Sequence, residues 1–307
     1  MFQSQLYQFK LKTKMINPFD IKQEFKFLNN TQQQCTLYSK QQLNRSTYLM
    51  RFAISQQDKC LGTRIGQQIS LNDPKFDINT TRYYCPISRI DDVGMFDLLV
   101  HAIYTEIRTF PLTLQHQIQD GHILNINGPF TNYLYHGYGT IEVPKYNINN
   151  NYLYFGIVAE SSAIAAFFQL IEGIAINGDN THIGLLYLAD TLDELVLMEE
   201  LIWYMEEKKI NATFLLRNEQ NSIGKVFSGP KGQLKTIYIC NSIYHNQMIK
   251  HQSLFVVVGL LKKKLNNNWN ISITKIQPQF DYILLNIILQ NIIFNYDIIK
   301  LNLINQL

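Results

Sequence analysis

The sequence predicts two domains of different class: an antiparallel six-stranded β-barrel, followed by a doubly wound α/β domain with a parallel sheet. Short apolar or alternating runs follow one another closely over residues 22–145. Strand-like and helix-like runs then alternate over residues 151–265. A polar, Asn-rich stretch at 144–151 separates the two patterns and is expected to be a linker. A chain of 307 residues is long enough to bury two cores of this size.

The first pattern predicts a barrel because its strands come in close succession and no helix is expected between them. Gly, Pro, Asn and Asp punctuate the runs, as they do at turns. The expected strands include residues 48–54, 66–72, 95–104, 122–128 and 132–143.

The second pattern predicts a parallel sheet because strands and helices alternate. Apolar runs at 152–159 and 182–189 are expected strands, each followed by an amphipathic segment. The expected helices cover residues 162–174 and 192–208. Two further strands are expected, at 212–217 and 253–260.

Bulk composition excludes several function classes. A net charge of +3, spread along the chain, argues against a nucleic-acid partner. The four cysteines form no Cys-x-x-Cys pair, which argues against a structural zinc site and a disulfide framework. The histidines show no metal-binding spacing, so no metal site is predicted. No secretory signal is visible.

Five separated stretches resemble one family. "STYLMRFAI…CLGTRIGQQISL", "TRYYCPISRIDDVGMFDLLV" and "GHILNINGPF" resemble the flavin domain of NADH–cytochrome b5 reductases. "GIVAESSAIAAFFQLIEGI" and "ADTLDELVLMEELIWY" resemble the nicotinamide domain of the same enzymes, in the same order. The resemblance covers about residues 22–260. It implies an FAD-binding-type barrel at 22–145 and an NAD(P)-binding-type α/β domain at 151–265.

The resemblance also implies residues for a flavin site. The family signature Arg-x-Tyr-(Thr/Ser)-x-x-Ser reads "RYYCPIS" here. By resemblance, Arg82 meets the FAD pyrophosphate, Tyr84 packs on the flavin, and Ser88 lies nearby. Cys85 replaces the hydroxyl that faces the flavin, and a thiol is only a weak donor. His101 takes the place of a strand lysine; it either faces FAD or is a strand histidine satisfied by its neighbours.

A second part of the family's flavin clamp is missing. Members carry a Gly-Lys-Met-Ser-like segment whose backbone N–H groups hold the pyrophosphate. The corresponding "FPLTLQHQIQDGHILNINGPF" is shorter and has neither that glycine nor that lysine. The sequence therefore leaves FAD binding open.

The nicotinamide side departs further from the family. The family loop Gly-Gly-Thr-Gly is replaced by Glu160, Ser161, Ser162 and Ala163. Glycines let the pyrophosphate approach the backbone and the helix N-terminus. A carboxylate about 4 Å from a phosphate costs roughly 4 kcal/mol at an effective dielectric of 20. In this interpretation Glu160 complements the helix dipole, and Ser161 or Ser162 caps the helix.

A second nicotinamide-side motif is also absent. The family ends a core strand with Cys-Gly-Pro-Pro, and here Val258 and Gly259 are followed by two leucines. Both departures argue against NAD(P)H binding, and the sequence offers no catalytic residue in its place. Degeneration at this site predicts an accessory or structural subunit, with a mitochondrial respiratory assembly as the suspected setting. The alternative is an active FAD-dependent NAD(P)H oxidoreductase of the cytochrome b5 reductase type.

The two ends of the chain lie outside the family core. The N-terminal arm, residues 1–21, carries three lysines and no acid before Asp20, somewhat like a transit peptide but without arginines. The tail, residues 266–307, is apolar with polar interruptions, and its apolar run is shorter than the ~20 residues of a membrane span. It is interpreted as a segment docking on partner subunits, an interfacial membrane helix, or an artefact of gene prediction. Docking is favoured, and proximity to an inner mitochondrial membrane is expected; a cytoplasmic or membrane-surface location is the alternative.

Overall fold

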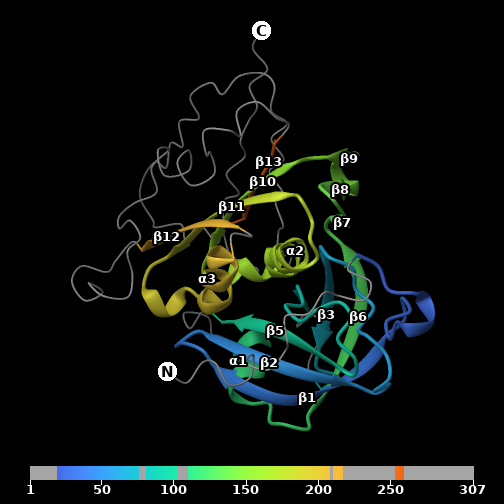
Figure 1. Cartoon of the computed structure of the whole chain (residues 1–307). Helices are drawn as coiled ribbons and strands as arrows, with labels where there is room; N and C mark the ends of the chain where they lie inside the picture. Colours follow the sequence, from blue (N-terminus) through green and yellow to red (C-terminus); the bar gives the residue numbers. More distant parts are fainter. Residues whose placement is uncertain (1–18, 76–80, 103–109, 208–209, 217–252, 259–307) are drawn as a thin grey trace.

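The computed structural model describes residues 19–75, 81–102, 110–207, 210–216 and 253–258 (Figure 1). In residues 253–258 only the backbone is described. The predictions that concern the N-terminal arm up to residue 18, Gly259 and the tail at 266–307 lie outside these ranges.

The first domain is a six-stranded antiparallel sheet with the order β4-β3-β6-β1-β2-β5. A bridge between Pro86 and Leu98 joins its two ends, so the sheet curls into a barrel. Alternation explains the inner face: in β3, Ile69 and Leu71 are fully buried in the barrel core. The strands are β1 (Gln33–Gln42), β2 (Thr47–Ile54), β3 (Gln67–Asn72), β4 (Arg82–Tyr84), β5 (Met95–His101) and β6 (Ile123–Thr131).

A short helix, α1 (Phe110–His116), lies between β5 and β6. The expectation that the first domain has no helix is therefore wrong. Leu114 is fully buried in the barrel core. The Lys40 ammonium donates to the carbonyls of Gln115 and Ile118 at 2.8 and 2.6 Å, which satisfies groups at the helix end.

The stretch at 144–151, expected to be a linker, is part of a small antiparallel sheet instead. This sheet has the order β7-β8-β9, with β7 (Leu134–Gly137), β8 (Thr140–Val143) and β9 (Ile148–Asn151). A 3-10 turn at Pro144–Tyr146 joins the last two strands, and Asn147 takes a left-handed conformation (φ 53°) that asparagine tolerates. The exposed asparagines of β9 gave the stretch its linker-like composition.

The second domain has a four-stranded parallel sheet with the order β12-β11-β10-β13. Its described strands are β10 (Tyr154–Glu160), β11 (His182–Ala189), β12 (Asn211–Leu216) and β13 (Ser253–Val258). Helix α2 (Ala165–Ile176) follows β10, and α3 (Met198–Glu206) follows β11. A barrel followed by an α/β domain confirms the predicted fold class.

Helices α2 and α3 lie between the parallel sheet and the barrel (Figure 1). One apolar cluster contains Ile65 and Leu99 of the first domain together with Phe168 and Ile171 of α2. Hydrogen bonds cross the same boundary, among them Gln169 Nε2 to the Ser88 carbonyl at 2.6 Å, Tyr133 Oη to the Ala166 carbonyl at 3.0 Å, and Asn44 Nδ2 to the Asp193 carbonyl at 2.8 Å. The two domains therefore pack directly on each other.

None of the helices in the described part of the chain is both long enough and apolar enough to span a membrane. The same part of the chain contains no cluster of His, Cys, Asp and Glu side chains that could hold a metal ion.

Candidate functional site

The predicted flavin signature lies on β4, at the seam where the barrel closes. In the pairing of β3 with β4, Tyr84 is opposite Ile69 and Arg82 is opposite Leu71. Directly opposite residues of an antiparallel pair share a face. Arg82 and Tyr84 are therefore on the face of the barrel core, and Tyr83 is on the outer face.

The hydroxyl of Tyr84 is buried and, within the described residues, has no hydrogen-bond partner. Burial raises the pKa of Tyr84 well above its usual value, and the nearby Arg82 cation acts in the opposite direction. A buried donor without a partner costs about 1–3 kcal/mol, so a ligand oxygen placed there would be stabilised. The Arg82 guanidinium also donates to the Thr81 carbonyl at 3.0 Å. Arg82 carries the positive charge that a pyrophosphate needs, and beside it the Tyr84 side chain packs in the barrel core.

The other three predicted flavin-site residues differ in their burial and in their hydrogen-bond partners. Cys85 is half-buried, and burial raises its pKa to about 12, so the thiol is neutral at physiological pH. The Ser88 hydroxyl accepts the backbone N–H of Asp97 at 3.1 Å. His101 Nδ1 is 3.0 Å from the hydroxyl of buried Thr47. Arg82, Tyr84 and Cys85 thus gather at the seam, whereas Ser88 and His101 make contacts within the barrel.

The predicted nucleotide loop lies at the carboxyl end of β10. This strand is flanked by β11 on one side and β13 on the other, so the strand order reverses there. Ligands of open parallel sheets bind at such a switch point. Glu160 ends β10 with only 4% of its surface exposed. An acidic side chain therefore lies buried where a phosphate would approach.

Ser161 has a left-handed backbone conformation, with φ +48°. The family has a glycine at this position, and glycine adopts such angles without steric cost. The Tyr187 hydroxyl donates to the Ser161 carbonyl at 2.8 Å and is 3.2 Å from the Val196 carbonyl. Tyr187 is fully buried, so this contact fixes the loop from beneath.

The capping expectation for this loop is wrong. Residues Ser161–Ile164 form a 3-10 turn, and the α-helix begins at Ala165 rather than at Ser162. Neither the turn nor the helix has a side-chain cap at its first residue. Ser162 is half-buried and Ala163 is 7% exposed. Side chains therefore occupy the loop where the family leaves backbone open. Val258 is the last residue of β13, and Gly259, which follows it in the second motif, lies outside the described residues.

Sequence reasoning missed Tyr133, which lies at the boundary of the two domains. Its ring stacks on Phe167 of α2 with centroids 5.9 Å apart and 18° between planes. Burial raises its pKa well above the usual value, and Cys85 is close enough to add to the effect. Tyr133 therefore connects the flavin signature to the start of α2. In the sequence it is one tyrosine of an alternating strand run, so no signal distinguishes it.

Comparison with known proteins gives the context of this site. Residues 34–135 match the family described as oxidoreductase FAD-binding domain. An NADH nitrate reductase of Oryza sativa subsp. japonica is 30% identical over 175 residues, which cover 54% of this chain and 19% of the relative. One from Phaseolus vulgaris is 26% identical over 194 residues, or 60% of this chain and 22% of the relative. The chain thus spans about a fifth of the length of these relatives.

Solved structures agree in fold. The cytochrome b5 reductase domain of Ulva prolifera nitrate reductase superposes with a TM-score of 0.66 at 19% identity, covering 76% of this chain and 89% of that one. The CS-b5R domains of human Ncb5or give a TM-score of 0.56 at 14% identity, covering 75% of this chain and 63% of that one. The chain therefore has the fold of these reductase domains, and its barrel resembles an FAD-binding domain over residues 34–135.

Proposed function

Because this chain is a divergent, cytochrome b5 reductase-like member of the ferredoxin-reductase-like superfamily, we propose that it retains a place for FAD but has lost the NAD(P)H site. Its role would then be that of an accessory flavin-fold protein rather than an NAD(P)H-consuming enzyme. The buried carboxylate of Glu160 at the phosphate loop is the observation that carries the proposal.

The loop opposes a dinucleotide in two ways. A carboxylate about 4 Å from a phosphate costs roughly 4 kcal/mol, or about a thousandfold in affinity. The family loop leaves room for a phosphate at its backbone N–H groups, whereas here the buried residues Ser161 and Ala163 place side chains in the loop. Restoring the site therefore needs more than the removal of one charge.

On the flavin side, Arg82 would bind the pyrophosphate and the Tyr84 hydroxyl would donate to a ribityl or phosphate oxygen. Bound FAD would supply one- and two-electron redox chemistry. The neutral thiol of Cys85 would be the nearest weak donor in the signature. Tyr133 and the start of α2 pack together beside Cys85. They would therefore limit the access of water and of a nicotinamide ring to the bound flavin.

A second candidate function is an active FAD-dependent NAD(P)H oxidoreductase. The Arg82–Tyr84 pair at the seam favours it, because this is the part of the signature that holds the cofactor. Similarity to NADH nitrate reductases favours it as well. In this case the nicotinamide would have to enter after Glu160 moves, or bind in another place.

The accessory role implies protein partners. We propose that the N-terminal arm and residues 266–307 attach the chain to other subunits of a mitochondrial inner-membrane assembly, with no nucleic acid involved. Composition supports this: the arm is basic and the tail apolar. Size-exclusion chromatography of the chain with and without residues 266–307, beside native gels of the source membrane fraction, tests it. A monomer that never migrates with a larger complex contradicts it.

Two measurements separate the candidate functions. The visible absorption spectrum of the purified protein, before and after addition of FAD, reports flavin binding at Arg82 and Tyr84. Calorimetric titration with NADH reports binding at the NAD(P)H site. We expect a flavin band that NADH does not bleach and no measurable heat of NADH binding. Micromolar NADH binding, or bleaching of the flavin, establishes the reductase instead.

Arg82→Met and Glu160→Gln give matched variants for the two sites. The first should lose FAD with NADH titrations unchanged. The second should leave the FAD spectrum unchanged and, in this proposal, still fail to bind NADH tightly, because the side chains and the Tyr187 contact remain.

A further inference from the structure

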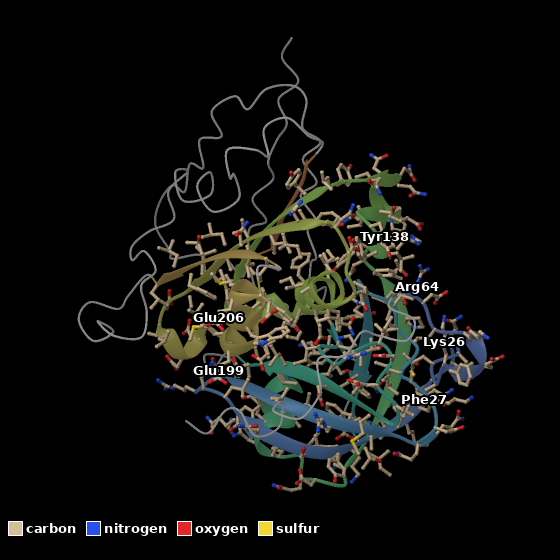
Figure 2. All side chains as sticks on the ribbon, in the orientation of Figure 1. Lys26, Phe27, Arg64, Tyr138, Glu199 and Glu206 are labelled. Atoms are coloured by element: carbon tan, nitrogen blue, oxygen red, sulfur yellow. The ribbon has the colours of Figure 1, made fainter. Side chains whose placement is uncertain are left out.

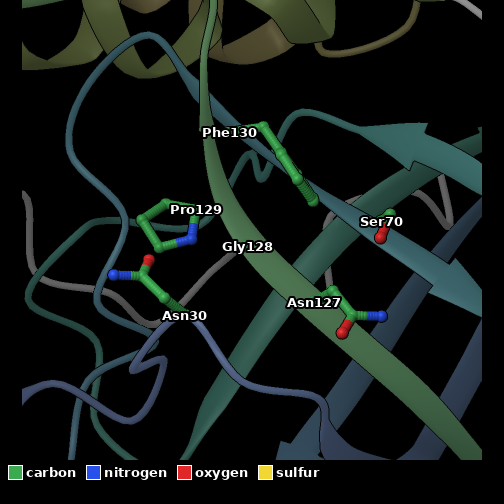
Figure 3. A pocket seen from close by; sticks show the side chains of 6 residues that line it. All are labelled: Asn30, Ser70, Asn127, Gly128, Pro129 and Phe130. Carbon is green, nitrogen blue, oxygen red and sulfur yellow. The ribbon is translucent and has the colours of Figure 1, made fainter.

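A hollow on the outer face of the barrel has the chemistry of a ligand site. It has a volume of about 270 Å³ and lies where the segment before β1 passes beside β3 and the end of β6 (Figure 3). Its lining residues are Asn30, Ser70, Asn127, Gly128, Pro129 and Phe130. None of these six is charged, so the hollow suits a neutral group.

The polar side chains of this hollow have hydrogen-bonding capacity to spare. Asn30, Ser70 and Asn127 make no side-chain hydrogen bond with any other residue that the structure describes. Ser70 is 2% exposed and is one of the residues that line the hollow. Together the two carboxamides and the hydroxyl offer both donors and acceptors.

An aromatic ring completes this hollow. Phe130 is 37% exposed, a large value for a phenylalanine. Its ring meets that of Tyr83 edge-on, with centroids 5.2 Å apart and 75° between planes, which holds it in position. A flat heterocycle could therefore stack on Phe130 while the carboxamides bind its edge.

A second hollow adjoins the first and supplies positive charge. Its volume is about 160 Å³, and Asn30 and Pro129 line both hollows. Lys26 and Arg64 line the second one only. Figure 2 places both cations on the flank of the barrel away from the acidic residues Glu199 and Glu206 of α3.

The two cations are available to an anion. Lys26 and Arg64 both contact Asp20, at 3.1 and 3.8 Å. Arg64 also donates to the Phe19 carbonyl at 3.4 Å and lies 3.0 Å from His136 Nδ1, so an anion would share it with these two groups. The Asp20 side chain is 55% exposed and does not line either hollow. The Lys26 and Arg64 side chains are only 16% and 23% exposed, so the exposed Asp20 is the partner that an anion can replace at little cost. A phosphate dianion could thus replace Asp20 as the partner of both cations.

This pair of hollows is distinct from the flavin signature. Ser70 pairs with Tyr83 in the β3–β4 ladder, and both face outward. Arg82 and Tyr84 alternate with Tyr83 and face the barrel core. A ligand in the hollows would therefore lie against the outer face of the sheet, which is opposite to the face that carries Arg82 and Tyr84.

We propose that the two hollows form one binding site for a nucleoside monophosphate. Its base stacks on Phe130, its base or ribose edge bonds to Asn30, Ser70 and Asn127, and its phosphate lies between Lys26 and Arg64. A neutral aromatic compartment joined to a cationic one is the pattern such a ligand requires. The site does not depend on the proposed loss of NAD(P)H binding.

Calorimetry and ligand-observed NMR with AMP, adenosine, ribose 5-phosphate and inorganic phosphate test the proposal on the full chain. AMP should bind saturably and more tightly than each of the other three. Phe130→Ala and Lys26→Gln should each weaken AMP binding by about tenfold. The matched controls Tyr38→Ala, an exposed aromatic elsewhere, and Lys75→Gln, an exposed lysine outside the hollows, should leave it unchanged.

Three outcomes would overturn the proposal. The first is no saturable AMP binding at millimolar ligand in chain that circular dichroism shows to be folded. The second is equal affinity for ribose 5-phosphate, since stacking would then contribute nothing. The third is competition between AMP and saturating FAD, which would assign the hollows to the flavin site. A Phe130→Ala chain that fails to fold is replaced by Asn127→Leu, for which the same tenfold loss is expected.

Discussion

Ser161→Gly should stabilise the protein, although it removes a side chain. Ser161 is the first residue of the turn after β10 and has φ +48°. A left-handed conformation costs a residue with a Cβ about 1–2 kcal/mol. Glycine avoids that cost but loses about 0.5–1 kcal/mol more in conformational entropy on folding. The expected net gain is therefore about 0.5–1 kcal/mol, because the Ser161 side chain makes no hydrogen bond that the structure describes.

Urea denaturation gives the free energy of unfolding for this comparison. The matched control is Ser162→Gly, since Ser162 lies in the same 3-10 turn but is not among the residues with positive φ. Without strain to relieve, glycine there should destabilise the protein by about 0.5–1 kcal/mol. A difference of 1 kcal/mol corresponds to about 2–4 °C in Tm for a chain of this size class.

The opposite ranking would refute this reasoning. If Ser161→Gly destabilises the protein as much as Ser162→Gly does, then the left-handed conformation at Ser161 stores no strain. The variant also moves the loop towards the family pattern. We expect it to leave NADH binding undetectable, because Glu160 and Ala163 remain buried.

Three further changes test other parts of the structure. Arg51→Met should lower the free energy of unfolding, measured by urea denaturation, by about 3 kcal/mol. The reason is that Asp97, which is 2% exposed, loses the guanidinium that binds it at 2.7 and 2.8 Å. A loss below 1 kcal/mol contradicts this. At pH 8, Cys85 should be alkylated roughly a thousandfold more slowly than a free thiol, as measured by peptide mass spectrometry. Its pKa is raised to about 12, so very little reactive thiolate is present at pH 8. A rate near that of a free thiol contradicts this. Gly173→Val should destabilise the protein by about 1–3 kcal/mol. Even a Cβ atom at this position would be 2.7 Å from Ile65 Cδ1, across the boundary of the two domains. Unchanged stability would argue against close packing there.

The fold was predictable where periodicity and burial agree. In β3, alternation sets Ile69 and Leu71 in the barrel core and Ser70 on the opposite face. Strands β10 and β11 are buried almost throughout and read as continuous apolar runs, as is typical of strands in a parallel sheet.

The prediction of secondary structure failed in three short segments, where backbone conformation or strand pairing decided the structure. The helix expected over 192–208 is instead a 3-10 turn and α3, because Leu197 has φ +60° and ends any continuous helix. Helix α1 has only seven residues, too few for a periodic pattern to separate it from a strand. The asparagines of β9 are exposed, so the sequence of this strand lacks the apolar residues by which its pairing with β8 could have been predicted.

The candidate sites show the same division. Glu160 and the Arg82–Tyr84 pair could be located from the sequence, because each stands at a fixed offset from a strand. The groups that decide what those residues do come from distant positions. Tyr187 binds the Ser161 carbonyl across 26 residues, and Tyr133 reaches α2 across 33 residues. Neither contact can be predicted from spacing.

The retained backbone at Ser161 bears on how the nucleotide loop changed. If glycine alone had imposed the left-handed turn, replacing it by serine should have allowed the chain to adopt a common conformation. The turn persists because its two flanks are fixed: Glu160 is the last residue of β10 in register with β11, and the Ser161 carbonyl is bound by buried Tyr187. The frame of the loop therefore depends on the sheet and on Tyr187, not on the residue in the turn. Side chains could enter this frame without collapsing the domain, at the cost of the space that a phosphate would need.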